Sequence, residues 1–129
     1  MTFRLDPNLV GVAGLRLDFD AGPEATIQIT YADGTQSPLG AIGLDGVYRL
    51  TRGMNLDQAG HPFVDFQDLS VGMRGRWMDA RTFALEYDTI VNYYSYILQM
   101  RFDGDRLSLA LSDRAALPLA TITGTLAEH

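Results

Sequence analysis

The sequence of 129 residues contains no cysteine and no lysine. Without cysteine, neither a disulfide nor a thiolate-ligated zinc site can form, and the compartment is left open. Without lysine, the chain cannot use Schiff-base chemistry, a Ser-x-x-Lys nucleophile or a P-loop lysine. All ten basic residues are arginines, and they are scattered along the chain.

Long apolar runs and excess positive charge are also missing. No stretch is long and apolar enough to predict a membrane span, and the first residues lack the apolar region of a signal peptide. The net charge of −6 argues against binding to nucleic acid or to an anionic membrane surface. The length predicts a single domain over residues 1–129, with enough chain to bury a core.

What the sequence does contain is a repeated alternation of apolar and polar residues, which is typical of half-buried strands. It is clearest in three consecutive segments within residues 75–111. The side chains expected to face inward are Phe83, Leu85, Tyr87, Tyr94, Tyr96, Leu98, Met100, Phe102, Leu107, Leu109 and Leu111. The last two segments meet either at a two-residue turn, Asp103-Gly104, or at a four-residue loop over residues 103–106. We favour the loop, because the shorter turn places Arg101 opposite Arg106.

Shorter alternating segments predict further strands. They cover residues 15–19, 27–31, 47–51, 69–78 and 120–126, with an interrupted strand at 35–42. Residues 1–12 are expected to be loop-like, and residues 52–62 irregular. About nine or ten short strands without a helix predict an all-β fold. We expect an antiparallel meander that closes into a lipocalin-like β-barrel, with a two-sheet β-sandwich as the alternative.

Candidate catalytic and metal-binding groups are sparse. Glu86 and Asp88 lie two apart on one strand, about 7 Å from each other, which is loosely compatible with paired-carboxylate catalysis. We expect both on a solvated outer face, because the residues between them point inward. The spacing of His61, Asp65 and Asp68 matches no known metal site. The sequence therefore predicts no catalytic residue, no metal and no cofactor.

If the barrel binds a ligand, we expect its interior to supply the contacts. The candidate ligand-binding residues are Trp77, Tyr87, Tyr94, Tyr96 and Met100. Aromatic side chains dominate protein cores, so packing is the simpler role for most of them. Trp77 is expected to plug one end of the barrel.

A set of packing and turn motifs in the second half of the chain has a counterpart in a known family. The motifs are Gly75-x-Trp77, Thr82-Phe83, Glu86-Tyr87-Asp88 and Phe102-Asp103-Gly104-Asp105, preceded by Leu44-Asp45-Gly46-Val47-Tyr48. Together they resemble the C-terminal β-domain appended to bacterial serine hydrolases of the β-lactamase/penicillin-binding-protein type. The resemblance is good over the last half of the chain and weak over the first half.

The resemblance implies a lipocalin-like barrel or sandwich beside an N-terminal catalytic domain in the same chain. The 129 residues would then be an excised C-terminal domain, and the catalytic Ser-x-x-Lys would belong to the other domain. The implied function is non-catalytic: packing, substrate access or dimer contacts, with a homodimer possible. The alternatives are a stand-alone barrel that binds a small apolar ligand, and a hydrolase or isomerase that uses Glu86 or Asp88.

Overall fold

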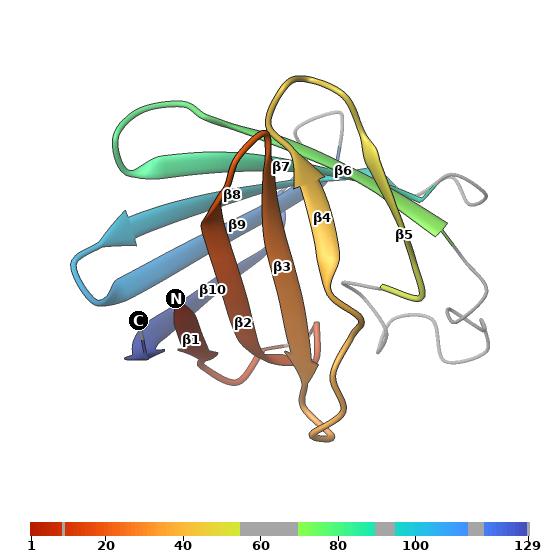
Figure 1. Ribbon diagram of the computed structural model, residues 1–129. Helices are drawn as coiled ribbons and strands as arrows, with labels where there is room; N and C mark the ends of the chain where they lie inside the picture. The colour runs from red at the N-terminus through yellow and green to blue at the C-terminus, as the bar shows by residue number, and fades with distance from the viewer. Residues whose placement is uncertain (9, 55–69, 90–94, 114–117, 129) are drawn as a thin grey trace.

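The computed structural model describes residues 1–8, 10–54, 70–89, 95–113 and 118–128, and these contain ten strands and no helix (Figure 1). The strands are β1 (Thr2–Leu5), β2 (Val12–Ala21), β3 (Glu24–Tyr31), β4 (Gly40–Gly43), β5 (Arg49–Arg52), β6 (Ser70–Trp77), β7 (Thr82–Thr89), β8 (Ser95–Asp103), β9 (Arg106–Asp113) and β10 (Pro118–Glu128). The prediction of an all-β fold is confirmed.

Nine of these strands close into a barrel. Neighbouring strands pair antiparallel in the order β4, β3, β2, β1, β10, β9, β8, β7, β6, and the ring closes where β4 meets β6. This last pairing is parallel and joins Gly43 to Arg74. Strand β5 lies outside the ring and pairs with β6 (Figure 1). The lipocalin-like barrel is confirmed, and the sandwich alternative is not.

The first strand was not predicted. Residues 1–12 were expected to be loop-like, which is wrong, because β1 lies between β2 and β10 and joins the two halves of the barrel. Its inward side chains, Phe3 and Leu5, are both buried. Two apolar positions before the turn formers Pro7 and Asn8 are too few for the alternation to be recognised.

The register of the β8–β9 hairpin agrees with the favoured pairing. Phe102 lies opposite Leu107 and Arg101 opposite Ser108, so the two arginines do not face each other. The loop is shorter than expected, however, because Asp103 pairs with Arg106 and extends both strands. The turn that remains is Gly104-Asp105, and the positive φ of Gly104 (62°) suits a two-residue hairpin loop.

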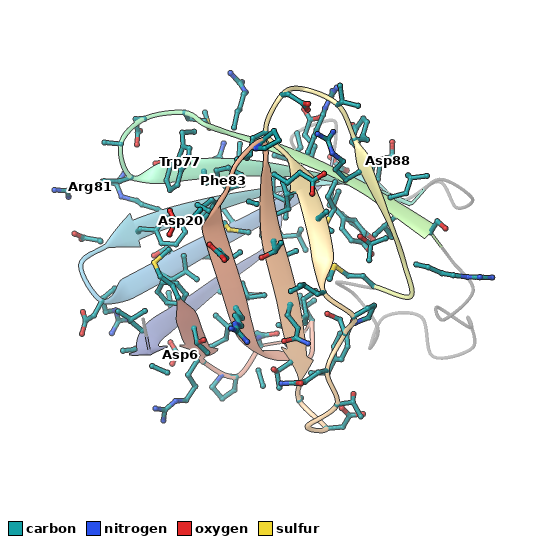
Figure 2. All side chains as sticks on the ribbon, in the orientation of Figure 1. Asp6, Asp20, Trp77, Arg81, Phe83 and Asp88 are labelled. Carbon is teal, nitrogen blue, oxygen red and sulfur yellow. The ribbon has the colours of Figure 1, made fainter. Side chains whose placement is uncertain are left out.

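The barrel interior is filled by apolar side chains from every strand of the ring. Phe83, Leu85, Tyr87, Leu98, Met100, Leu107, Leu109 and Leu111 are all buried, as the alternation predicts. One end of the barrel is aromatic: the Trp77 ring lies 5.0 Å from that of Phe19 and 5.2 Å from that of Phe83, between ring centroids. Trp77 is 45% exposed, so it covers this end of the barrel at its rim and is not a fully buried plug (Figure 2).

The aromatic end depends on a glycine. A Cβ atom at Gly75 would lie 2.6 Å from Cε2 of Phe83 and overlap its Cζ, and it would lie 3.0 Å from the carbonyl oxygen of Ala84. The Phe83 ring cannot easily move away, because it is fully buried and packs against Trp77 and Phe19. Gly75 therefore provides the space that the Phe83 ring occupies.

Replacing Gly75 with alanine is expected to lower the free energy of unfolding by about 1–3 kcal/mol, the usual cost of overpacking a core. Urea denaturation measures this loss. Phe83→Leu removes the atoms that overlap the new Cβ, so the double variant should lose less stability than the sum of the two single variants. Strictly additive losses would show that the Phe83 ring is not what excludes a side chain at position 75.

Candidate functional site

Of the predicted ligand-binding residues, Tyr87 and Met100 belong to the packed core and Tyr96 packs against it. Met100 and Tyr87 are fully buried, and Tyr96 is half-buried with its ring centroid 6.0 Å from that of Tyr87. Trp77 lies at the aromatic end of the barrel, and Tyr94 is outside the described residues. The structure thus brings Tyr87 and Tyr96 together but leaves Trp77 in a separate cluster. A ligand-binding role for these residues stays a prediction.

One void among the core side chains is bounded by described residues, and it is small. Its volume is about 20 Å³, and its lining is wholly apolar: Leu5, Val10, Val12, Leu15, Leu98, Leu109, Leu111 and Ile122. This is roughly the room that one water molecule needs, and an apolar cavity of this kind stays dry. None of the candidate ligand-binding residues lines this void. It offers no space for a ligand.

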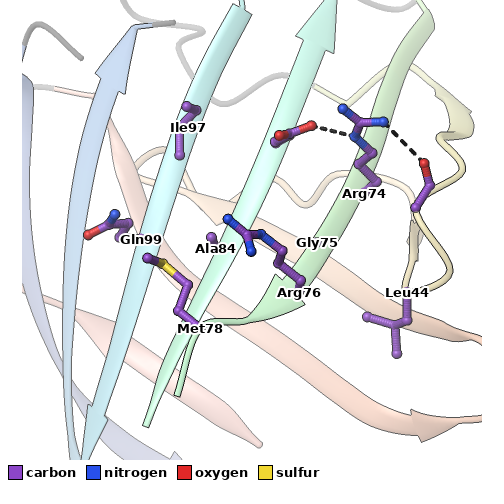
Figure 3. Close-up of a pocket in the computed structure, with 10 residues that line it drawn as sticks. Leu44, Arg74, Gly75, Arg76, Met78, Ala84, Ile97 and Gln99 are labelled. Carbon is purple, nitrogen blue, oxygen red and sulfur yellow. Dashed lines mark hydrogen bonds and ion pairs between the residues drawn. The ribbon is translucent and has the colours of Figure 1, made fainter. Parts of the chain in front are cut away.

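A much larger hollow lies on the outer surface, over β6, β7 and β8 (Figure 3). We call it the outer groove. Its volume is about 420 Å³, within the range of small-molecule sites. The residues that line it are Leu44, Gly46, Arg74, Gly75, Arg76, Met78, Ala84, Glu86, Ile97 and Gln99. On the strands these are mostly outward-facing side chains, so the groove and the core use opposite faces of the same sheet.

One wall of the outer groove is the connection between β4 and β5. It folds back on itself because Gly43 has no Cβ: a side-chain atom there would overlap the carbonyl oxygen of Val47. Arg49 holds the fold, since its guanidinium donates to Glu24 Oε1 at 2.7 Å, Asp45 Oδ2 at 2.9 Å and the Val47 carbonyl at 2.8 Å. The hydrogen bonds from Arg49 and from the Val47 amide lower the pKa of Asp45.

A second arginine ties this wall to the sheet. The guanidinium of Arg74 stacks on Tyr48, 4.3 Å from the ring centroid, pairs with Glu86, and donates to the Gly46 carbonyl at 3.1 Å. The Tyr48 hydroxyl donates to the same Glu86 oxygen at 3.1 Å (Figure 3 shows the Arg74 contacts). The hydrogen bond with Glu86 raises the pKa of Arg74. The Arg74 guanidinium is therefore engaged by contacts within the protein, which hold the wall in place.

Arg76 is in a different situation. It is exposed, it lines the outer groove, and among the described residues it forms no hydrogen bond or ion pair. Across the sheet from it lie Ala84 and then Gln99, so a small side chain separates two polar ones. Met78 lies beside this row in the close-up (Figure 3). The groove thus offers an unengaged guanidinium and an amide above an apolar floor.

The two carboxylates singled out in the sequence are both on the outer face, as expected. Neither is simply solvated: Glu86 pairs with Arg74 and lines the outer groove, and Asp88 accepts a hydrogen bond from the Ser95 hydroxyl at 3.1 Å. His61, Asp65 and Asp68 lie outside the described residues. Within the described ranges, no three metal-ligating side chains come together.

Comparison of the chain with protein-family models, with curated proteins and with solved structures found no match. The resemblance to a hydrolase-associated β-domain therefore stays a prediction. As to membranes, the part of the chain that the structure describes has no helix with the length and hydrophobicity needed to cross one.

The outer groove was missed in the sequence, although a signal for it was present. The alternation places Ala84 and Ile97 on the outer face, among arginines and acids, where polar residues are expected. Apolar residues on a solvent-facing side mark a covered or binding surface. What the sequence could not give is the wall, because Leu44 and Gly46 come from a distant part of the chain.

The pKa of Asp45 is lowered in the folded chain from its ordinary value of 3.8. The ionised Asp45 therefore stabilises the fold at pH values above 3.8, and this stabilisation is lost as the pH falls through the lower pKa of the folded state. A carboxyl NMR titration should place its midpoint below 3.8. In Arg49→Met, we expect the midpoint to rise part of the way back, since the Val47 amide still donates. Asp33 is the control, because its pKa is lowered by hydrogen bonds from Thr35 and should not respond to the loss of Arg49. An unchanged Asp45 midpoint would contradict the role of Arg49.

Tyr87 provides a test of the packed interior. Its buried hydroxyl donates to the Met54 carbonyl at 2.9 Å, so Tyr87→Phe should cost about 1–1.5 kcal/mol in free energy of unfolding. Tyr48→Phe removes a hydroxyl bonded to half-exposed Glu86, where water can replace it, and should cost less. Chemical denaturation of both variants measures the difference. Equal losses would mean that the Tyr87 hydroxyl has no special structural role.

Proposed function

We propose that this barrel is a non-catalytic accessory domain that works through its outer surface. The observation that carries the proposal is the packed interior, in which Tyr87 and Met100 pack with other core side chains and the described void is about 20 Å³. A lipocalin-type carrier needs an open interior. The alternative of an apolar ligand inside the barrel gains no support from this packing.

The proposed neighbour is the catalytic domain of a serine hydrolase of the β-lactamase/penicillin-binding-protein type, in the same chain. The motifs around Gly75, Trp77 and residues 102–105 support it through the resemblance described above. The surface offers a contact for such a neighbour: Val47 and Leu50, around the start of β5, are 59% and 65% exposed. Two large apolar side chains, three residues apart and both exposed, offer a partner an apolar contact.

The lack of catalysis by the barrel itself is tested with the chain alone. We expect no turnover of a chromogenic cephalosporin or of p-nitrophenyl acetate above the buffer rate. Glu86→Gln and Asp88→Asn are the matched variants, because each removes one carboxylate charge and keeps the side-chain shape. Turnover that either variant abolishes would overturn the proposal and favour a hydrolase that uses these carboxylates.

The proposed contact is tested in the full-length hydrolase. Leu50→Asp should speed proteolytic cleavage between the two domains, because a charge is costly in an apolar interface. Leu39→Asp is the control, since Leu39 is 60% exposed and lies in the β3–β4 connection. If the reading frame contains no hydrolase, or if both variants have the same effect, the proposed contact is wrong.

A further inference from the structure

The outer groove has the size and chemistry of a binding site for a particular class of small molecule. We propose that it binds a monocarboxylate with an aliphatic body, and that Arg76 is the group that pairs with the carboxylate. This inference goes beyond the accessory role, because the groove can bind such a ligand whether or not a hydrolase lies beside the barrel.

The sign of the ligand charge follows from the charges in the groove. Among the described lining residues there are two guanidiniums, Arg74 and Arg76, and one carboxylate, Glu86. They leave one positive charge in a chain whose net charge is −6. Arg74 is already paired with Glu86 and stacked on Tyr48, so the surplus charge belongs to Arg76. A guanidinium binds a carboxylate through two parallel hydrogen bonds.

The size of the ligand charge follows from the same arrangement. Glu86 lies on β7 opposite Arg74, and Arg76 lies two residues further along β6. A ligand with two negative charges would find only one guanidinium that lacks a partner among the described residues, that of Arg76. Its second charge would be repelled by the Glu86 carboxylate, because like charges repel in a partly desolvated site. One negative charge is the best match to the single free cation among the described lining residues.

The ligand body follows from the remaining lining residues. Leu44, Met78, Ala84 and Ile97 supply aliphatic and thioether surface, and none of the described lining residues is aromatic. Ala84 is nearly fully buried although it is on the outer face, so the floor is already partly withdrawn from water. Such a surface packs well against a flexible alkyl chain. The Gln99 amide, on β8 on the far side of Ala84, gives the carboxylate a second donor.

The groove is held in one conformation, which supports its role as a binding site. The wall at residues 44–48 is held by Arg49 on one side and by Arg74 on the other, through side-chain hydrogen bonds to Glu24, Asp45 and Glu86. The opposite side is the paired sheet β6–β7–β8. A ligand would therefore meet a preformed groove and would not have to order a loop, which lowers the cost of binding.

The test uses the whole chain and sodium octanoate, followed by ¹H–¹⁵N NMR and calorimetry. We expect saturable shifts at the Arg76 Nε–H and the Gln99 side-chain amide. Arg76→Gln should weaken binding about tenfold, the effect of losing one charge-assisted hydrogen bond. Arg16→Gln is the matched control, because Arg16 is an exposed arginine on β2 and its loss changes the net charge equally. Its affinity for octanoate should equal that of the unmodified chain.

Further arms separate the contributions of head group and body. Octylamine should not bind, acetate should bind far more weakly than octanoate, and octyl phosphate should bind more weakly because of its second charge. Met78→Ala should weaken octanoate binding without affecting the fold, since Met78 is exposed.

Four outcomes would overturn the proposal. They are no saturable shift with octanoate, equal weakening by Arg76→Gln and Arg16→Gln, binding of octylamine as tight as that of octanoate, and shifts centred on the interior residues Leu98 and Leu109. The last outcome would place the alkyl chain inside the barrel instead of in the outer groove.

Discussion

The structure depends on the one place where two strands of the barrel run parallel. Eight antiparallel steps lead from β4 around the ring to β6, and an even number of reversals returns the chain to its starting direction. A nine-stranded meander can therefore close only through a parallel pair, here Gly43 with Arg74. Closure removes the exposed strand edges that favour aggregation. The parallel pairing is short, because β4 has only four residues. Strand β5 pairs with another part of β6, outside the ring.

The same seam creates the outer groove. Gly43 lets the chain fold back next to the seam, and Arg74, its pairing partner, ties the returning segment to β7 through Glu86. These ion pairs are partly exposed, and pairs of this kind contribute little to overall stability. Their effect is geometric. A planar guanidinium with several fixed acceptors holds a loop in one position better than a lysine ammonium would, which suits a chain whose basic residues are all arginines.

The interior of the barrel was predictable from the sequence, and its outer surface was not. The inward positions of Phe83, Leu98 and Leu109 could be predicted because a period of two is a local property of the chain. The same alternation predicted which side chains of β6 to β9 face inward and which face outward. Nothing local, however, indicates that Leu44 lines the same groove as Ile97. Strand β1 was missed because it is too short for its alternation to be recognised, and its pairing with β10 joins the two ends of the described chain.

The aromatic end has an optical consequence. Trp77 is the only tryptophan of the chain, and its ring packs on Phe19 and Phe83 on the inner side of β6, whereas its neighbours Arg76 and Met78 line the groove on the outer side. The sole strong fluorophore therefore lies on the reverse side of the strand that carries Arg76. A molecule that fills a rigid groove would leave the emission spectrum unchanged. A spectral shift would instead report that the backbone at residues 76–78 itself had moved.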